Sequence, residues 1–138
     1  MRTLFRLAAL GAAIAAFLPA VAADATLLTA RELKWIELAE PKGARHAVLW
    51  GDASGEHALL VRWPFNTKVA NVVRDQDLHV FVHAGTFTVD AGGAYKEFGP
   101  SGVVVVPKGV KHTLGCEAAG ECRFVIHHPG PVKVTQSK

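Results

Sequence analysis

From residue 45 onward, short hydrophobic runs are separated by turn-forming residues, such as those at 64–66, 91–93, 99–102 and 129–131. No run after residue 43 keeps the 3.6-residue apolar period that a surface helix would show. The pattern predicts β-strands at 45–50, 57–63, 69–73, 78–89, 95–98, 103–107, 111–116, 123–127 and 132–135. Many short strands at even spacing indicate an all-β sandwich or barrel.

The alternation within two of these runs predicts which side chains are buried. In the strand that starts at residue 78, Leu78, Val80 and Val82 share one face, and His79 lies on the other. The run 103–106 is valine at every position, which favours burial on both faces.

The first 23 residues have the composition of a secretory signal peptide. Arg2 and Arg6 supply positive charge, residues 7–18 are uncharged and apolar, and 20–22 form a small-residue cleavage pattern. We expect cleavage after residue 22 or 23, export to the periplasm or the medium, and an N-terminal arm over 24–43. A retained membrane anchor is the alternative, although residues 7–18 are few for a span of about 20 residues.

The chain has two cysteines, Cys116 and Cys122, on either side of a small polar segment. A hairpin between the predicted strands would bring their side chains together, and an oxidising compartment would favour a disulfide between them. Two free thiols in neighbouring strands are the alternative. A zinc site is disfavoured because the intervening segment, 117–121, is longer than the usual gap of about two to four residues.

Charge limits the classes of partner. Lysine and arginine number 15 against 12 aspartates and glutamates, a net charge of +3. Without Arg2 and Arg6 the counts are 13 and 12, which leaves +1. We therefore expect no nucleic-acid partner, and no membrane contact once the signal peptide is removed.

The segment Pro107-Lys-Gly109-Val-Lys-His112 resembles the second motif of the cupin superfamily, P-x-G-x-x-H. The resemblance covers roughly residues 33–135 and extends to small secreted cupins of unknown function. It implies a single antiparallel β-barrel, or double-stranded β-helix of jelly-roll type, over 44–138. It also implies that His112 is a metal ligand. A homodimer is one oligomeric state that the resemblance implies.

The first cupin motif keeps its spacing in this chain but not its ligands. If Gly85 is its closing glycine, counting back places the opening glycine at Asn66, and asparagine tolerates the left-handed conformation. The two histidine positions fall on Val72 and Arg74, and the glutamate position falls on Leu78. Aliphatic side chains cannot bind a metal, and a guanidinium is itself a cation. We therefore expect no cofactor.

A divalent transition metal remains the alternative. It would need His112 together with substitute ligands at Asp77 and His79. The protein would then be a metal-dependent cupin enzyme, an isomerase, dioxygenase or decarboxylase. An interaction module that uses exposed tryptophans is a further alternative.

The main functional hypothesis is a metal-free protein that binds a small acidic molecule. Arg74 and His112 would meet the acid group, with Val72, Leu78 and Val80 as apolar walls. The alternative is that Arg74 lies in a polar turn, pairs with a neighbouring aspartate and faces water.

The remaining histidines are interpreted as structural or solvated. We expect His46, His57 and His83 at the surface. Of the adjacent pair His127 and His128, at most one can point into the interior, because neighbouring strand residues face opposite sides.

Overall fold

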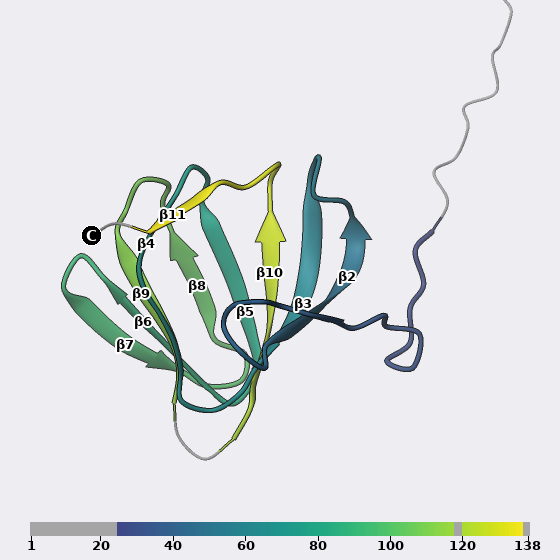
Figure 1. Ribbon diagram of the computed structural model, residues 1–138, viewed down its shortest axis with the longest axis horizontal. Coiled ribbons are helices and arrows are strands. Elements are labelled where there is room, and N and C mark those ends of the chain that lie inside the picture. The colour runs from purple at the N-terminus through teal and green to yellow at the C-terminus, as the bar shows by residue number, and fades with distance from the viewer. Residues whose placement is uncertain (1–24, 118–119, 137–138) are drawn as a thin grey trace, which may run out of the picture.

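The computed structural model describes residues 25–117 and 120–136, and these residues form eleven β-strands (Figure 1). Their bounds are β1 (Ile36–Glu37), β2 (Arg45–Gly51), β3 (His57–Trp63), β4 (Thr67–Arg74), β5 (Leu78–Ala84), β6 (Thr86–Ala91), β7 (Ala94–Phe98), β8 (Val103–Val106), β9 (His112–Glu117), β10 (Cys122–His128) and β11 (Val134–Gln136).

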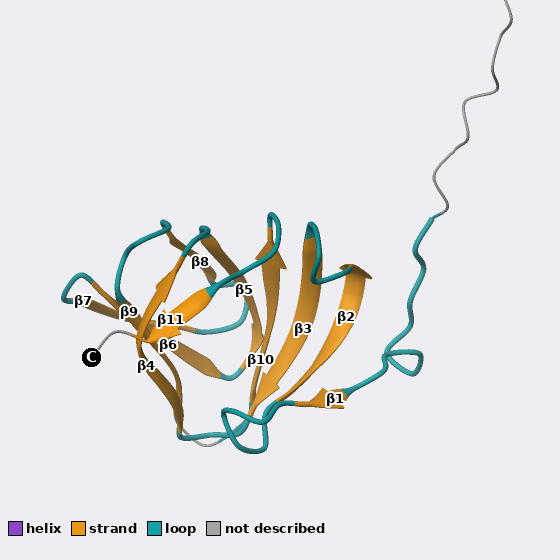
Figure 2. Cartoon of the chain, turned by 45° about the horizontal axis from the view of Figure 1, so that its top comes forward, coloured by secondary structure: helices purple, strands orange, loops and turns teal. Residues whose placement is uncertain are grey.

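The strands form two antiparallel sheets, so the prediction of an all-β fold is confirmed (Figure 2). One sheet has the order β1-β2-β3-β10-β5-β8, and the other has the order β11-β4-β9-β6-β7. Among the described strands, no hydrogen-bonded pairing joins the edge of one sheet to the other, so the arrangement is two sheets rather than one closed barrel.

The predicted strand over 78–89 is divided into β5 and β6 at Gly85. This residue has a φ of 84°, and an added Cβ would lie 2.6 Å from the carbonyl oxygen of Glu121. The backbone therefore turns at a position that only glycine fits, and the chain passes from one sheet to the other.

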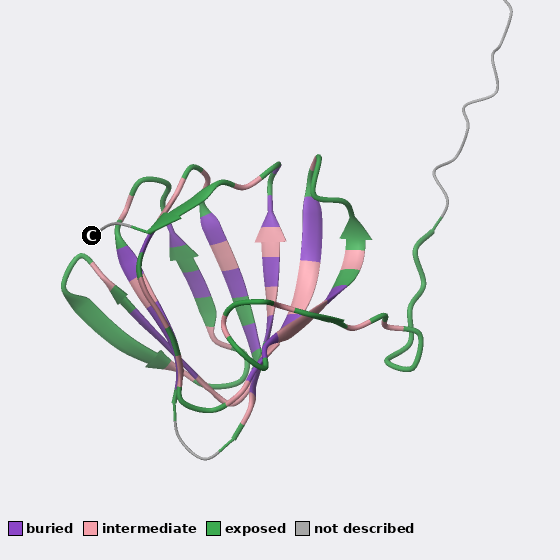
Figure 3. Cartoon of the chain, viewed as in Figure 1, coloured by how far each residue is buried: buried purple, intermediate pink, exposed green. Residues whose placement is uncertain are grey.

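The core lies where the inner faces of the two sheets meet, shown as the purple bands of Figure 3. Trp63 and Phe87 both pack on Phe124, with ring centroids 5.1 and 4.6 Å from it. The predicted apolar face of β5 belongs to this core, because Leu78 and Val80 are fully buried.

The expectation for the valine run was wrong. Val104 and Val106 are buried, but Val103 and Val105 are 55% and 60% exposed. The reason is that, among the described residues, nothing covers the outer face of this sheet, so outward side chains are exposed on interior β5 (Phe81) as well as on β8. Four consecutive valines carry no period that could have indicated this.

The predicted signal peptide, 1–23, lies outside the described residues. Within the predicted arm, 24–43, β1 pairs with β2, and the indole of Trp35 lies 5.6 and 5.3 Å from the guanidinium carbons of Arg45 and Arg62. No helix in the described part of the chain is long and apolar enough to cross a membrane.

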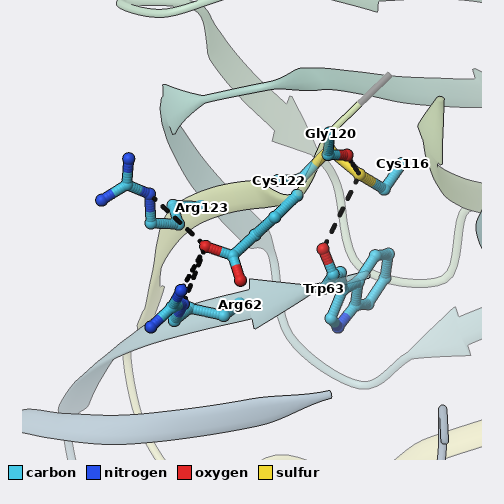
Figure 4. A network of polar contacts seen from close by, with 7 residues as sticks. Arg62, Trp63, Cys116, Gly120, Cys122 and Arg123 are labelled. Carbon is cyan, nitrogen blue, oxygen red and sulfur yellow. Dashed lines mark hydrogen bonds and ion pairs between the residues drawn. A yellow bond between two sulfur atoms is a disulfide. The ribbon is translucent and has the colours of Figure 1, made fainter. Parts of the chain in front are cut away.

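The predicted disulfide between Cys116 and Cys122 is confirmed (Figure 4). It joins β9 of one sheet to β10 of the other, and both cysteines are fully buried. Beside it, Glu121 accepts a hydrogen bond of 2.6 Å from Arg62. The disulfide therefore ties the two sheets together at one end of the core.

Candidate functional site

Both sequence motifs adopt the backbone conformation that their spacing requires. Asn66, at the opening position of the first motif, has a φ of 63°, and Gly85 at its close has 84°. In the second motif, Gly109 has a φ of 77°, and Ser101, in the connection that precedes β8, has one of 70°. The left-handed turns that set the register are thus present although the first motif carries none of the family's ligands.

The candidate site lies at the end of the sheets where the connections 75–77, 107–111 and 129–133 meet, which we call the loop end. Asp75 accepts a 2.8 Å hydrogen bond from the backbone nitrogen of Lys133, and Asp77 accepts one of 2.8 Å from that of Lys108. The two aspartates thereby fasten the 75–77 turn to the other two connections.

Two predicted pocket residues, Val72 and His112, are cross-strand partners on β4 and β9 at this end. Val72 is buried, and Arg74, two positions further along β4, follows it on the same face. Leu78 and Val80 are buried on the inner face of the opposite sheet.

Arg74 is half-buried, and its guanidinium has no carboxylate partner among the described residues. Its Nε is inaccessible to solvent and has no hydrogen-bond acceptor. Asp75 and Asp77 do not pair with it, since both bind backbone nitrogens instead. Burial lowers the pKa of Arg74, yet an arginine stays charged in practice. The loop end therefore holds a partly desolvated positive charge.

His112 is almost completely buried, with 2% of its surface exposed. Its Nδ1 lies 2.8 Å from the carbonyl oxygen of Val110, while its Nε2 is buried without a partner. Burial is the main reason that the pKa of His112 is lowered, and the charge of Arg74 lowers it further. Near pH 7 the ring is therefore neutral.

Two further histidines, His57 and His128, lie at the loop end. His57, predicted to be solvated, is only 6% exposed, so that prediction was wrong. Its ring centroid lies 4.6 Å from that of His128, the member of the adjacent histidine pair that points inward. Burial, followed by the charges of Arg74, His57 and His127, lowers the pKa of His128 to about 4.

A signal for both histidines was present in the sequence. Val61 and Trp63 on β3 share the inner face with His57, and Phe124 and Ile126 on β10 share it with His128. Extending each alternation to the strand end would have placed both rings inside.

The alternative metal ligands are not brought together. Asp77 binds the nitrogen of Lys108, and His79 lies on the outer face of its sheet, with its Nδ1 3.3 Å from that of His127. His112 points to the inner side instead. In the part of the chain that the structure describes, no three histidine, cysteine or acidic side chains are placed to hold a metal ion.

The residues at the family's metal positions do not fit a divalent cation. His112 offers one nitrogen lone pair, but Val72 and Leu78 have no donor atom, and the cation of Arg74 stands where a second histidine would bind. Of these four residues, only Arg74 carries free N–H donors, and His112 presents a single ring nitrogen.

Solved structures share this fold. RemF, a polyketide cyclase from Streptomyces resistomycificus, is 19% identical, with 82% of this chain and 85% of that chain covered and a TM-score of 0.70. KdgF from Halomonas sp. is 17% identical over 73% and 92% of the two chains, with a TM-score of 0.60. A salicylate 1,2-dioxygenase from Pseudoaminobacter salicylatoxidans is 13% identical over 72% and 31%, with a TM-score of 0.60.

At these identities the structural similarity establishes the fold alone, and no curated protein sequence matches the chain. The sequence itself matches the family described as the ChrR cupin-like domain over residues 23–131. The protein therefore belongs to the ChrR cupin-like domain family, within the cupin superfamily.

Proposed function

We propose that this protein is exported and binds a small acidic molecule at the loop end without a metal. The observation that carries the proposal is the buried Nε of Arg74, a charged donor with no acceptor among the described residues. A buried charge without a partner is costly, and a bound carboxylate or phosphate would supply the missing acceptor.

The surroundings of Arg74 suit a small organic anion. The residues proposed as its walls are apolar, since Val72 and Leu78 are each 1% exposed and Val80 is fully buried, and His112 would add a polar atom. A few polar groups within apolar surroundings are typical of small-molecule sites. Low local polarity also strengthens the attraction between the arginine and an anion.

Two observations support export. Residues 1–23 have the charge and cleavage pattern of a signal peptide, and the chain contains a buried disulfide. Disulfides persist mainly in oxidising compartments such as the periplasm or the extracellular medium.

The alternative function is a metal-dependent enzyme, and one observation favours it. His112 and His57 each hold a ring nitrogen 2.8 Å from a backbone carbonyl oxygen, of Val110 and Gly55 respectively. Metal-binding histidines commonly make this contact with their second nitrogen. Elemental analysis of the purified protein separates the two functions, because stoichiometric Fe, Mn, Ni or Zn would support the enzyme.

The binding proposal is tested by comparing Arg74→Gln with Arg123→Gln. The second variant removes an arginine of β10 whose side chain is 46% exposed, so both variants lose one positive charge. We expect small carboxylates and inorganic phosphate to raise the melting temperature of the wild type and of Arg123→Gln. Arg74→Gln should lose this shift, and equal shifts in all three proteins would contradict the proposal.

A further inference from the structure

His112 is fixed in one tautomer by its surroundings. A carbonyl oxygen can only accept a hydrogen bond, so the 2.8 Å contact with Val110 requires that Nδ1 carry the proton. In the neutral ring, Nε2 then carries a lone pair and can only accept a hydrogen bond. This atom is buried and has no donor among the described residues. The loop end thus contains an unsatisfied acceptor.

Arg74 contributes the opposite kind of atom. Its Nε–H is a buried donor without an acceptor, and it follows Val72, the cross-strand partner of His112, on the same face of β4. A ligand at this place must therefore meet a donor and an acceptor together.

An anion without a hydrogen-bond donor satisfies Nε of Arg74 but not Nε2 of His112. Its oxygens accept from Arg74, but they would face the lone pair of His112, which is repulsive. Protonation of His112 would remove the conflict. A second positive charge on a buried ring next to the guanidinium of Arg74 would be costly, which opposes that route.

We infer that the ligand is an anion that carries its own hydrogen-bond donor next to the acid group. Arg74 binds the acid oxygens, and the ligand's O–H donates to Nε2 of His112. Two chemical sources fit this description, a 2-hydroxycarboxylate and a protonated oxyanion such as hydrogen phosphate. This inference rests on the proposed function, because it names the ligand class of the same site.

The test uses two matched pairs of probes, measured by isothermal titration calorimetry at pH 7.5. Glycolate differs from acetate by one hydroxyl group, and hydrogen phosphate differs from sulfate by one proton. We expect the donor-bearing member of at least one pair to bind about tenfold more tightly or better, since the other leaves a buried acceptor unpaired. A preference within the glycolate pair indicates a 2-hydroxycarboxylate ligand, and a preference within the phosphate pair indicates a protonated oxyanion.

Variants connect the preference to His112. In His112→Phe the acceptor is gone, so the affinity ratio within the preferred pair should fall to about one while binding through Arg74 remains. His83→Phe makes the same exchange at an exposed histidine of β5 and should keep the wild-type ratio.

The outcomes separate the inference from the function on which it rests. If acetate and sulfate bind the wild type as tightly as glycolate and hydrogen phosphate, the inference is wrong and anion binding stands. Uptake of one proton on acetate binding, seen as a dependence of the heat on the buffer, would also overturn it. If none of the four anions binds, both fail.

Discussion

At the loop end, burial changes the pKa of single residues. His128 is the clearest case, since burial beside Arg74 lowers its pKa to about 4 from an ordinary value of 6.5. The folded protein therefore prefers the neutral ring, whereas the unfolded chain takes up a proton as soon as the pH falls below about 6.5.

This difference predicts acid sensitivity. The contribution of His128 to the free energy of unfolding is fully present above pH 6.5 and is lost as the pH falls to about 4. We expect a loss of about 1–2 kcal/mol over this window in urea titrations. His128→Asn should flatten that part of the pH profile. His83→Asn, at an exposed histidine, should leave it unchanged, and identical profiles for all three proteins would refute the assignment.

The turn between β5 and β6 has no room for a side chain at Gly85. An added Cβ would lie 2.6 Å from the oxygen of Glu121 and 2.8 Å from the Cα of Cys122, at a φ of 84°. We expect Gly85→Ala to lower the free energy of unfolding by about 2 kcal/mol or more. Gly92 has a φ of 61° but open space around it, so Gly92→Ala should lose only about 1 kcal/mol. Equal losses would show that the close contacts are unimportant.

At the scale of elements, the two sheets are tied together at opposite ends by different means. The disulfide joins β9 to β10 at one end, and Asp75 and Asp77 fasten the connections at the loop end. One tie is covalent and the others are hydrogen bonds to backbone nitrogens, so only the first responds to a reductant.

The disulfide should therefore make a measurable contribution to stability. Closing so short a loop is worth about 2 kcal/mol. We expect a reductant to lower the free energy of unfolding of the wild type by that amount in urea. The double variant C116A/C122A should be insensitive to the reductant. Mass spectrometry of the exported protein should show two hydrogens fewer than the reduced chain, and two alkylatable thiols in that protein would contradict the pairing.

At the scale of the whole molecule, one sheet presents an exposed apolar face at its β8 edge. Phe81, Val103 and Val105 are 48%, 55% and 60% exposed, and Phe81 pairs with Val103 across β5 and β8. An unpaired edge strand with apolar side chains favours self-association. This face is consistent with the homodimer that the family resemblance implies.

We accordingly expect the wild type to sediment as a dimer. Val105→Lys should shift it to monomer, because a charge on the edge strand opposes pairing. The matched control is Val134→Lys, at a 51% exposed valine of β11 on the edge of the other sheet, which should remain dimeric. A monomeric wild type would refute this arrangement.

The proposed export also leads to a prediction for the whole chain. The charge and cleavage pattern of residues 1–23 predicts that the exported protein begins at Ala23 or Asp24. N-terminal sequencing of the exported protein checks this, and a chain that still starts at Met1 would contradict it.

The sequence alone determined the features that depend on local patterns. Alternation identified the apolar face of Leu78 and Val80, and spacing placed Asn66 at a left-handed turn, where its φ is 63°. The disulfide followed from two cysteines beside a short polar segment. These features were predictable because the backbone period and turn chemistry act over a few neighbouring residues.

The tertiary structure decided what depends on distant partners. Asp75 and Asp77 accept hydrogen bonds from backbone nitrogens 58 and 31 residues away in the sequence, and neither carboxylate pairs with Arg74. The uncovered outer face of its sheet, and not the four valines of β8, decides that Val105 is exposed. Sequence pattern fixes the face on which a side chain lies, but the pairing of remote segments decides what covers that face and which charges meet there.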